Sequence, residues 1–282
     1  MNRFVDARHV ESVHELALGV EAIDAAREQP MLMPVMLTWD DLPLGNPRPR
    51  FERHPSNRQV LLYDAHLAAQ PRSVDLRLFD QTEALYAPDA DRRRFVPRRL
   101  RVNLPSLAGA QAQPPAARLC RPHLYPGPAY PVSNLVTGVR AHAMRAPTAT
   151  LALRPARWVR VLATVPAAQP VLALSTIVGR AGGDARGEFL LLLRFDVAAI
   201  AIDPLLSVRL RVFAGPELLP ATPDLPAIDP LWDLPRETAA SLADSDPVLR
   251  GEALPAGYVE VIQRVLPLPL GQLLRGQPHL TF

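Results

Sequence analysis

The sequence contains no lysine and only one cysteine, Cys120, among its 282 residues. A single cysteine excludes an internal disulfide framework. All 31 basic residues are arginine, a bias that is typical of a GC-rich coding genome and says little about function. Because a guanidinium group pairs with a carboxylate through two parallel hydrogen bonds, this composition favours ion pairs between protein surfaces.

The sequence also lacks a signal peptide and a membrane-spanning run. Its first residues, MNRFVDARHVESVHELALG, contain no apolar core. The densest apolar run, Glu188–Phe195 with its four consecutive leucines, is much shorter than the roughly 18 residues that cross a bilayer. We therefore expect no membrane span and synthesis in the cytoplasm without a signal peptide. A released particle would need a non-standard export route.

Motifs that carry chemistry are missing as well. The chain has no G-x-S-x-G, Walker A, H-E-x-x-H or G-x-G-x-x-G motif. Asp40 and Asp41 adjoin a proline turn and indicate a turn or cap rather than a glycosidase pair. Cys120 and His123 form a C-x-x-H pair without a second pair, which favours a loop cysteine over a metal ligand. We expect no catalytic, cofactor-binding or metal-binding residues, although a site assembled only in three dimensions stays open.

The formal net charge of +3 is small for this length, and basic and acidic residues alternate along the chain. A nucleic-acid-binding protein normally concentrates its basic residues on one face, together with stacking aromatics. One group of residues approaches that pattern: Arg92, Arg93, Arg94, Arg98, Arg99 and Arg101. We interpret them as solvated rim arginines paired with Asp75, Asp89 and Asp91, and we expect no nucleic acid as partner.

The chain is well supplied with apolar residues and proline. Hydrophobic residues make up 48%, enough for one or two cores, and 32 prolines stand against 14 glycines. Since proline breaks helices and donates no hydrogen bond to a sheet, this ratio favours short strands joined by rigid loops. Residues 8–28 fit a short helix or an extended arm. Alternating hydrophobicity then predicts four strands: Met31–Trp39, Arg58–Leu67, Ser73–Asp80 and Arg98–Leu104. For the last two strands the alternation predicts one face packed in the core and one face exposed to solvent.

The second half of the chain has the clearest strand pattern. Seven prolines in residues 105–131 predict a linker at 106–131. Short apolar runs at intervals of about 8–12 residues, separated by turns, then indicate a sandwich or barrel. The predicted strands are Leu135–Arg145, Thr148–Arg154, Arg157–Val165, Val171–Ala181, Gly187–Phe195 and Leu205–Ala214. After Pro216, leucines spaced by prolines predict an extended tail.

The segment GRAGGDARGEFLLLL (Gly179–Leu193) resembles the hairpin of carboxypeptidase-regulatory-like domains, a transthyretin-like family of sandwiches. The residues that match its pattern are Asp184, Gly187, Phe189 and Leu191. In such a hairpin, Asp184 would accept backbone N–H groups, Gly187 would supply a positive φ, and Phe189 would fill the core. The resemblance covers roughly residues 132–214. It implies a structural module without an active site of its own.

The predicted fold class is mostly β, with an antiparallel immunoglobulin-like or transthyretin-like sandwich, a second smaller β unit and an extended proline-rich tail. The expected domains are an N-terminal β-rich domain with a short helix or arm at 1–105, a proline-rich linker at 106–131, the sandwich at 132–215 and an extended C-terminal tail at 216–282.

The main functional expectation is a non-catalytic structural protein that binds other protein subunits of an assembly. The resemblance implies a bacterial phage-tail-like contractile injection system as its most specific version, and a homo-oligomer stays open. The alternative is a module that binds carbohydrate or a cell-surface polymer through aromatic side chains: Trp39, Trp158, Trp232, Tyr125 and Tyr130. Because only 6% of the chain is aromatic and sugar platforms need several exposed rings together, assembly is the preferred expectation.

Overall fold

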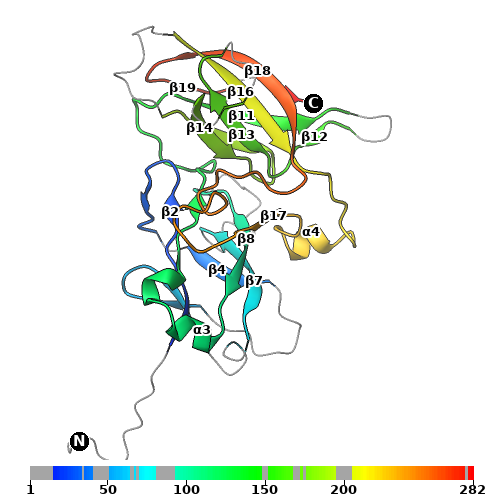
Figure 1. Cartoon of the computed structure of the whole chain (residues 1–282). Helices are drawn as coiled ribbons and strands as arrows, with labels where there is room; N and C mark the ends of the chain where they lie inside the picture. Colours follow the sequence, from blue (N-terminus) through cyan, green and yellow to red (C-terminus); the bar gives the residue numbers. More distant parts are fainter. Residues whose placement is uncertain are drawn as a thin grey trace, which may run out of the picture.

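The protein is mostly β, as predicted, and a computed structural model shows it as two lobes (Figure 1). The structure describes residues 15–33, 35–40, 51–63, 67, 70–80, 93–147, 152–167, 172–173, 176–194, 205–276 and 279–282. The helices that lie wholly within these residues are short. They are α3 (Leu107–Gln111), the 3-10 helix η2 (Pro115–Arg118) and α4 (Leu225–Ile228).

The first lobe, which we call the N-lobe, holds three small sheets with the strand orders β5-β6-β1-β9, β10-β2-β3 and β17-β8-β7-β4. Its strands are β1 (Leu16–Val20), β2 (Ile23–Asp24), β3 (Gln29–Pro30), β4 (Met36–Trp39), β5 (Glu52–Arg53), β6 (Gln59–Leu62), β7 (Arg72–Phe79), β8 (Arg98–Leu104), β9 (Leu119–Cys120), β10 (His123–Leu124) and β17 (Arg236–Thr238). Each of the four strands predicted in this region is present at least in part. The described part of the segment at 8–28 contributes β1 and β2 and ends in a turn at residues 25–28.

Strand β7 shows where the alternation of its sequence predicts burial and where it does not. One face is fully buried, as predicted, through Val74, Leu76 and Leu78. Most of the opposite face is buried as well: Asp75 and Phe79 are 0% and 6% exposed and Arg77 is partly buried, whereas Ser73 at the start of the strand is exposed. A later part of the chain covers this face: Arg77 Nη1 lies 2.7 Å from Asp229 Oδ2, and Arg236 Nε lies 2.7 Å from Asp75 Oδ2. The expectation of a wet face on β7 was therefore wrong.

The second lobe is the predicted sandwich. One sheet has the order β14-β13-β16-β18, and the other has the order β12-β11-β15 with β19 and β20 beside β11. Its strands are β11 (Gly138–Arg145), β12 (Arg154–Pro155), β13 (Arg160–Thr164), β14 (Ile177–Gly182), β15 (Glu188–Leu192), β16 (Leu205–Ala214), β18 (Val259–Pro269), β19 (Leu273–Leu274) and β20 (Leu280–Thr281). Five predicted strands overlap observed ones over several residues, and a sixth shares Arg154 with β12. Most of the sixth, Thr148–Arg154, lies outside the described residues.

The hairpin between β14 and β15 has the residue roles predicted from its sequence. Asp184 Oδ1 accepts hydrogen bonds from the backbone N–H groups of Arg186 at 2.7 Å and Glu188 at 3.0 Å. Gly187 has a φ of 72°, a conformation that residues with a Cβ rarely adopt. Phe189 is 1% exposed in the sandwich core. Since β14 belongs to one sheet and β15 to the other, this hairpin holds the two sheets together at one edge.

Residues 106–131 form part of the N-lobe and are not a linker. The Ser106 hydroxyl caps α3 by accepting a hydrogen bond from Gly109 N at 3.2 Å. Strands β9 and β10 then pair in parallel with β1 and β2. Leu124 and Tyr130 are 0% and 6% exposed in the N-lobe core. The prolines therefore interrupt short elements that are packed against the lobe.

Residues 216–282 are not an extended tail either. They contain α4 and β17 and then β18, an 11-residue strand that pairs antiparallel with β16 along its length. Pro267 and Pro269 hid this strand in the sequence. Because β18 is the last strand of its sheet, these prolines are tolerated there: a strand at a sheet edge needs hydrogen bonds on one side only.

Candidate functional site at the junction of the lobes

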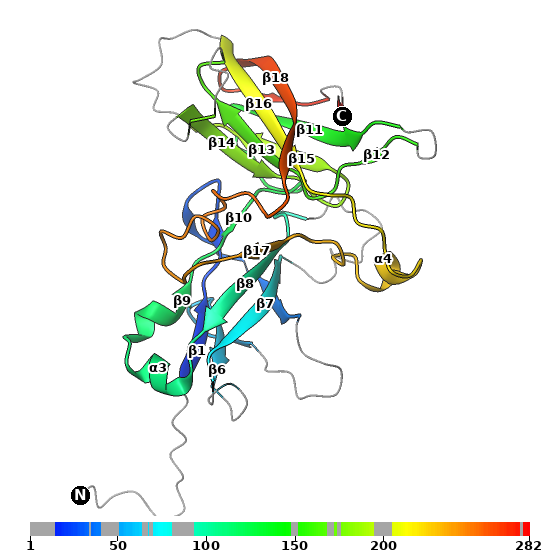
Figure 2. The same cartoon turned by 45° about the vertical axis from the view of Figure 1, so that its right-hand side comes forward.

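The chain crosses between the two lobes three times (Figure 2). It leaves the N-lobe after Tyr130 to form β11, and it returns after β16 to add α4 and β17 to the N-lobe. It then crosses again, after Gly251, to form β18. The segment that returns to the N-lobe, residues 215–258, is called the return segment below. The junction is thus built from three parts of the sequence that lie far apart.

A buried carboxylate lies between two buried arginines at this junction. Glu237 of β17 accepts hydrogen bonds from Arg98 of β8, at 2.7 Å and 3.1 Å, and from Arg160 of β13, at 2.7 Å. The three side chains are 0% to 4% exposed. Arg98 also donates to the backbone carbonyls of His123, Val248 and Leu249. The Arg98–Glu237–Arg160 network therefore joins the N-lobe, the sandwich and the return segment.

The electrostatics of the network keep Glu237 ionised. Burial on its own raises the pKa of Glu237, but the charges and hydrogen bonds of Arg98 and Arg160 outweigh it and leave the pKa below the ordinary value of 4.5. Tyr258, which donates a hydrogen bond to the Trp158 carbonyl at 2.7 Å, has its pKa raised to about 12, mainly by burial. The network thus carries two cations and one anion in the interior.

Tyr125 fills the centre of the junction. The Arg160 guanidinium lies 5.3 Å from the centre of its ring, within the range of a cation–π contact. Its hydroxyl donates a hydrogen bond to the carbonyl of Gly251. A Cβ at Gly182 would lie 3.0 Å from the tyrosine ring, so the close approach of β14 to Tyr125 depends on this glycine. The two lobes are therefore packed closely at Tyr125, and a residue larger than glycine at position 182 would crowd its ring.

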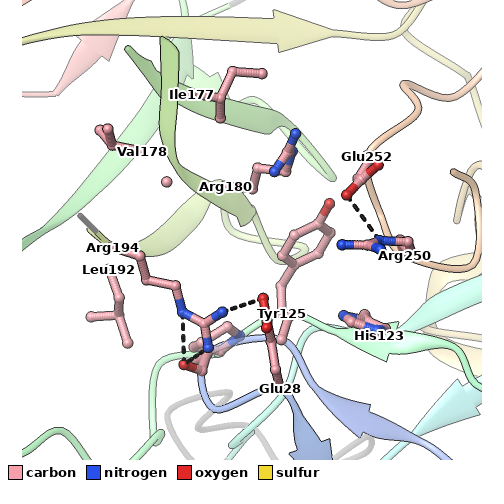
Figure 3. A pocket seen from close by; sticks show the side chains of 14 residues that line it. Glu28, His123, Tyr125, Ile177, Val178, Arg180, Leu192, Arg194, Arg250 and Glu252 are labelled. Atoms are coloured by element: carbon pink, nitrogen blue, oxygen red, sulfur yellow. Dashed lines mark hydrogen bonds and ion pairs between the residues drawn. The ribbon is translucent and has the colours of Figure 1, made fainter. Parts of the chain in front are cut away.

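A cavity of about 230 Å³ lies beside Tyr125 (Figure 3). Residues 25–28 and 123–126 of the N-lobe, strands β14 and β15, and the return segment form its walls. Its titratable lining side chains are Tyr125, Glu28, His123, Arg180, Arg194, Arg250 and Glu252. Arg194 Nε donates to the Ala26 carbonyl at 3.1 Å, and its Nη1 pairs with Glu28. Arg250 Nε lies 2.9 Å from Glu252 Oε1. The cavity is therefore polar and faces both lobes.

A second pocket, of about 210 Å³, opens on another side of the junction and has aromatic walls. Trp158, Trp232 and Tyr258 line it together with several arginines. Trp158 has a φ of 58°, which is rare for a bulky residue, and its indole N–H donates to Asp233 Oδ1 at 2.8 Å. The indole Nε1 of Trp232 is buried without a hydrogen-bond partner among the described residues. We call this the aromatic pocket.

Exposed apolar side chains line the aromatic pocket or lie within four residues of its lining in the sequence. Leu218 lines it and is 54% exposed, Leu219 follows directly and is 82% exposed, and Val259 follows the lining residue Tyr258 and is 62% exposed. Leu153 is 46% exposed and lies two residues before Pro155, which lines the pocket. Ile228 is 70% exposed and lies four residues before Trp232, which also lines it. We call these five residues the apolar rim.

The arginines that the sequence predicts to form a solvated rim differ in their burial and in their partners. Arg99 and Arg101 pair with Asp75, as predicted, at 3.5 Å and 2.6 Å. Arg93 and Arg98 do not lie at a solvated rim: Arg93 is 4% exposed, and Arg98 is fully buried and belongs to the junction network. The prediction was wrong for Arg98 because its partner, Glu237, lies 139 residues later in the sequence. Three residues of that prediction lie outside the described residues: Asp89, Asp91 and Arg92.

The residues considered for chemistry are spread over the N-lobe. Cys120 is buried in β9, and burial raises the pKa of its thiol to about 12, so the thiol stays protonated. His123 lines the cavity. Asp40 pairs with Arg99 at 2.6 Å, whereas Asp41 lies outside the described residues. In the described ranges, no group of three His, Cys, Asp or Glu side chains could hold a metal ion.

The five aromatic residues considered for sugar binding do not form one surface. Four are buried, with 2% to 6% of each residue exposed: Trp39, Tyr125, Tyr130 and Trp158. Trp39 and Tyr130 belong to the N-lobe core, and Tyr125 and Trp158 pack together in a separate cluster near the junction. Trp232 alone is partly exposed. A platform of adjacent exposed rings is therefore not present among these five residues.

Sequence reasoning did not find the central residues of this site. Arg160 offered a signal, because it is a charged residue within an apolar strand. Glu237 offered none, since it stands in a short polar stretch after several prolines. Arg250 likewise belongs to a turn that gave no motif, and Arg180, although it lies within Gly179–Leu193, was not among the residues that matched the hairpin pattern.

No family model matches the chain, and no curated protein matches it. In the part of the chain that the structure describes, no helix combines the length and the hydrophobicity that crossing a membrane requires.

Proposed function

We propose that this protein is a non-catalytic structural component that assembles with other protein subunits. The observation that carries the proposal is the aromatic pocket together with the exposed residues of the apolar rim, which line it or lie within a few residues of its lining in the sequence. Exposed apolar patches on soluble proteins mark interaction sites, because leaving them in water has a free-energy cost that a partner removes. Trp, Tyr and Arg, which line this pocket, are the residue types enriched at the centres of protein interfaces.

The junction supports the same proposal. The Arg98–Glu237–Arg160 network and Tyr125 hold the two lobes together with buried, hydrogen-bonded contacts. A body fixed in this way presents the apolar rim in one geometry. Because little conformational freedom is lost on binding, a preorganised surface associates at a lower entropic cost. This property suits a subunit that must hold its neighbours in a defined arrangement.

The more specific form of the proposal is a subunit of a bacterial phage-tail-like contractile injection system. It rests on the resemblance of the Asp184–Gly187–Phe189 hairpin to carboxypeptidase-regulatory-like domains, which is an argument by analogy. In this proposal the chain is made in the cytoplasm and joins a particle that is later released.

The test is assembly with the products of neighbouring genes. The full chain is co-expressed with each neighbour, and native mass spectrometry measures complex formation. We expect a defined complex with the unaltered chain and at least a tenfold weaker one with Leu219→Asp, since that change places a charge in the apolar rim. The matched control is Leu32→Asp, at an N-lobe leucine that is 92% exposed, which should assemble normally. A monodisperse monomer that binds none of the neighbours would overturn the proposal.

A further inference from the structure

The cavity in Figure 3 is lined by an arginine, Arg180, for which the described residues supply no hydrogen-bond or ion-pair partner. Arg180 extends from β14, opposite Leu162 of β13. Its Nε is buried, and among the described residues Arg180 has no hydrogen bond or ion pair. Burying a guanidinium nitrogen without an acceptor is unfavourable, because the hydration that it loses is not replaced. A ligand that supplies oxygen acceptors would remove this cost.

A second cation faces the same space from the other lobe. Arg250 of the return segment points toward Tyr125 and the cavity (Figure 3). Its Nε lies 2.9 Å from Glu252 Oε1, and its guanidinium group lies on the cavity side. Arg180 and Arg250 therefore approach the cavity from the sandwich and from the N-lobe side, respectively.

The remaining charges of the cavity leave a positive surplus. Arg194 is already occupied, because it pairs with Glu28 and donates to the Ala26 carbonyl. The three arginines exceed the two glutamates by one charge, and both glutamates are paired. Burial lowers the pKa of His123, and the charges of Arg250 and Arg98 lower it further, as expected in a positive field.

We infer that this cavity binds a phosphate group, held between Arg180 of the sandwich and Arg250 of the return segment. Guanidinium groups bind phosphate oxygens through paired, charge-assisted hydrogen bonds. The oxygens of a phosphate are arranged tetrahedrally and can accept from two arginines that approach from different sides, whereas a planar carboxylate offers only two oxygens. The volume of about 230 Å³ is below the roughly 300 Å³ of the smallest drug-sized pockets and fits a phosphate with a small organic group.

The experiment uses the full chain in phosphate-free buffer and two probes, inorganic phosphate and glycerol 3-phosphate. Thermal unfolding and titration calorimetry measure binding, with sodium chloride at equal ionic strength as the reference. We expect the unfolding temperature to rise with either probe relative to chloride, because a ligand that binds only the folded state stabilises it. Tighter binding of glycerol 3-phosphate would assign the site to phosphate monoesters, and equal affinities would assign it to phosphate itself.

Substitutions locate the site. Arg180→Gln and Arg250→Gln should each weaken binding at least about tenfold, since each removes charge-assisted hydrogen bonds to the phosphate. Arg264→Gln, at an exposed arginine on β18, is the matched control and should bind as the unaltered chain does. If Arg180→Gln does not fold, Arg250→Gln decides, because the Arg250 side chain is 45% exposed. The inference fails if neither probe exceeds chloride, or if the Arg250 variant and any folded Arg180 variant bind with unchanged affinity. Neither result depends on whether the protein assembles with others.

Discussion

Replacing Glu237 with glutamine is expected to lower the free energy of unfolding by about 3–5 kcal/mol, since breaking a buried ion pair leaves an uncompensated charge in the interior. Here two arginines, Arg98 and Arg160, would lose their common carboxylate, and Arg98 is fully buried. The three carbonyls that bind Arg98 would remain, but they carry no formal charge. Urea denaturation followed by circular dichroism measures the change.

The matched control is Glu217→Gln. Glu217 pairs with Arg154 at 2.5 Å, but the two side chains are 37% and 24% exposed, so water screens the interaction. Its loss should lower stability by no more than about 1 kcal/mol. Equal effects of the two substitutions would show that the junction network contributes no more than an ion pair at the surface.

The same network predicts a dependence of stability on pH. The pKa of Glu237 in the folded protein lies below its ordinary value of 4.5. The stabilisation by this carboxylate is therefore fully present above that ordinary value and is lost as the pH falls through the folded pKa. Urea midpoints measured from pH 7 down into the acid range should show the gap between the unaltered protein and Glu237→Gln becoming narrower. A gap that stays constant or widens in acid would contradict this prediction.

Replacing Phe189 with alanine should lower the free energy of unfolding by about 3–5 kcal/mol, the usual cost of removing a buried aromatic ring. Phe189 is 1% exposed and lies where the hairpin passes from one sheet of the sandwich to the other. Its loss would leave a cavity at the edge where β14 and β15 hold the sheets together. Denaturation monitored by tryptophan fluorescence is a suitable measurement, since Trp158 donates its backbone N–H to Asp184 of the same hairpin.

Two further variants make this prediction specific. Leu135→Ala removes a side chain that is 86% exposed and should change stability by no more than about 0.5 kcal/mol. Phe189→Leu keeps most of the volume and should cost clearly less than Phe189→Ala. If alanine were tolerated at position 189 as well as at 135, the hairpin would not anchor the sandwich core.

Most strands could be predicted from the sequence because alternation of apolar and polar residues is a local signal. Strand β8 matches its predicted range, Arg98–Leu104, and the hairpin at Asp184 was predicted from residues that lie within seven positions of one another. The prolines led to wrong predictions in two places. In residues 106–131 they interrupt short packed elements, and in β18 they stand on a sheet edge, where their missing N–H group costs little.

The candidate site could not be predicted because its contacts are not local. In the sequence, Arg98 resembles the other charged residues of an alternating strand. It becomes buried against Glu237 because β17, which comes late in the chain, pairs with β8. The polar face of β7 becomes buried for the same reason. The charge on Arg180 was visible in the sequence, but its lack of a partner depends on the placement of both lobes. Burial by remote segments is thus the part of the structure that periodicity does not report.

The three crossings of the chain also determine the order in which the protein can be completed during synthesis. Arg98 and Glu237 are 139 residues apart, so at about 5–20 residues per second the ribosome adds the glutamate roughly 7–28 seconds after the arginine. Throughout that interval the sheet β17-β8-β7-β4 lacks its β17 strand, and Arg98 has no carboxylate partner from β17. The sandwich strands β11 to β16 are all made before the N-lobe can close. The sandwich itself waits for β18, β19 and β20, which are made after β17, so neither lobe can finish folding on its first passage through the ribosome.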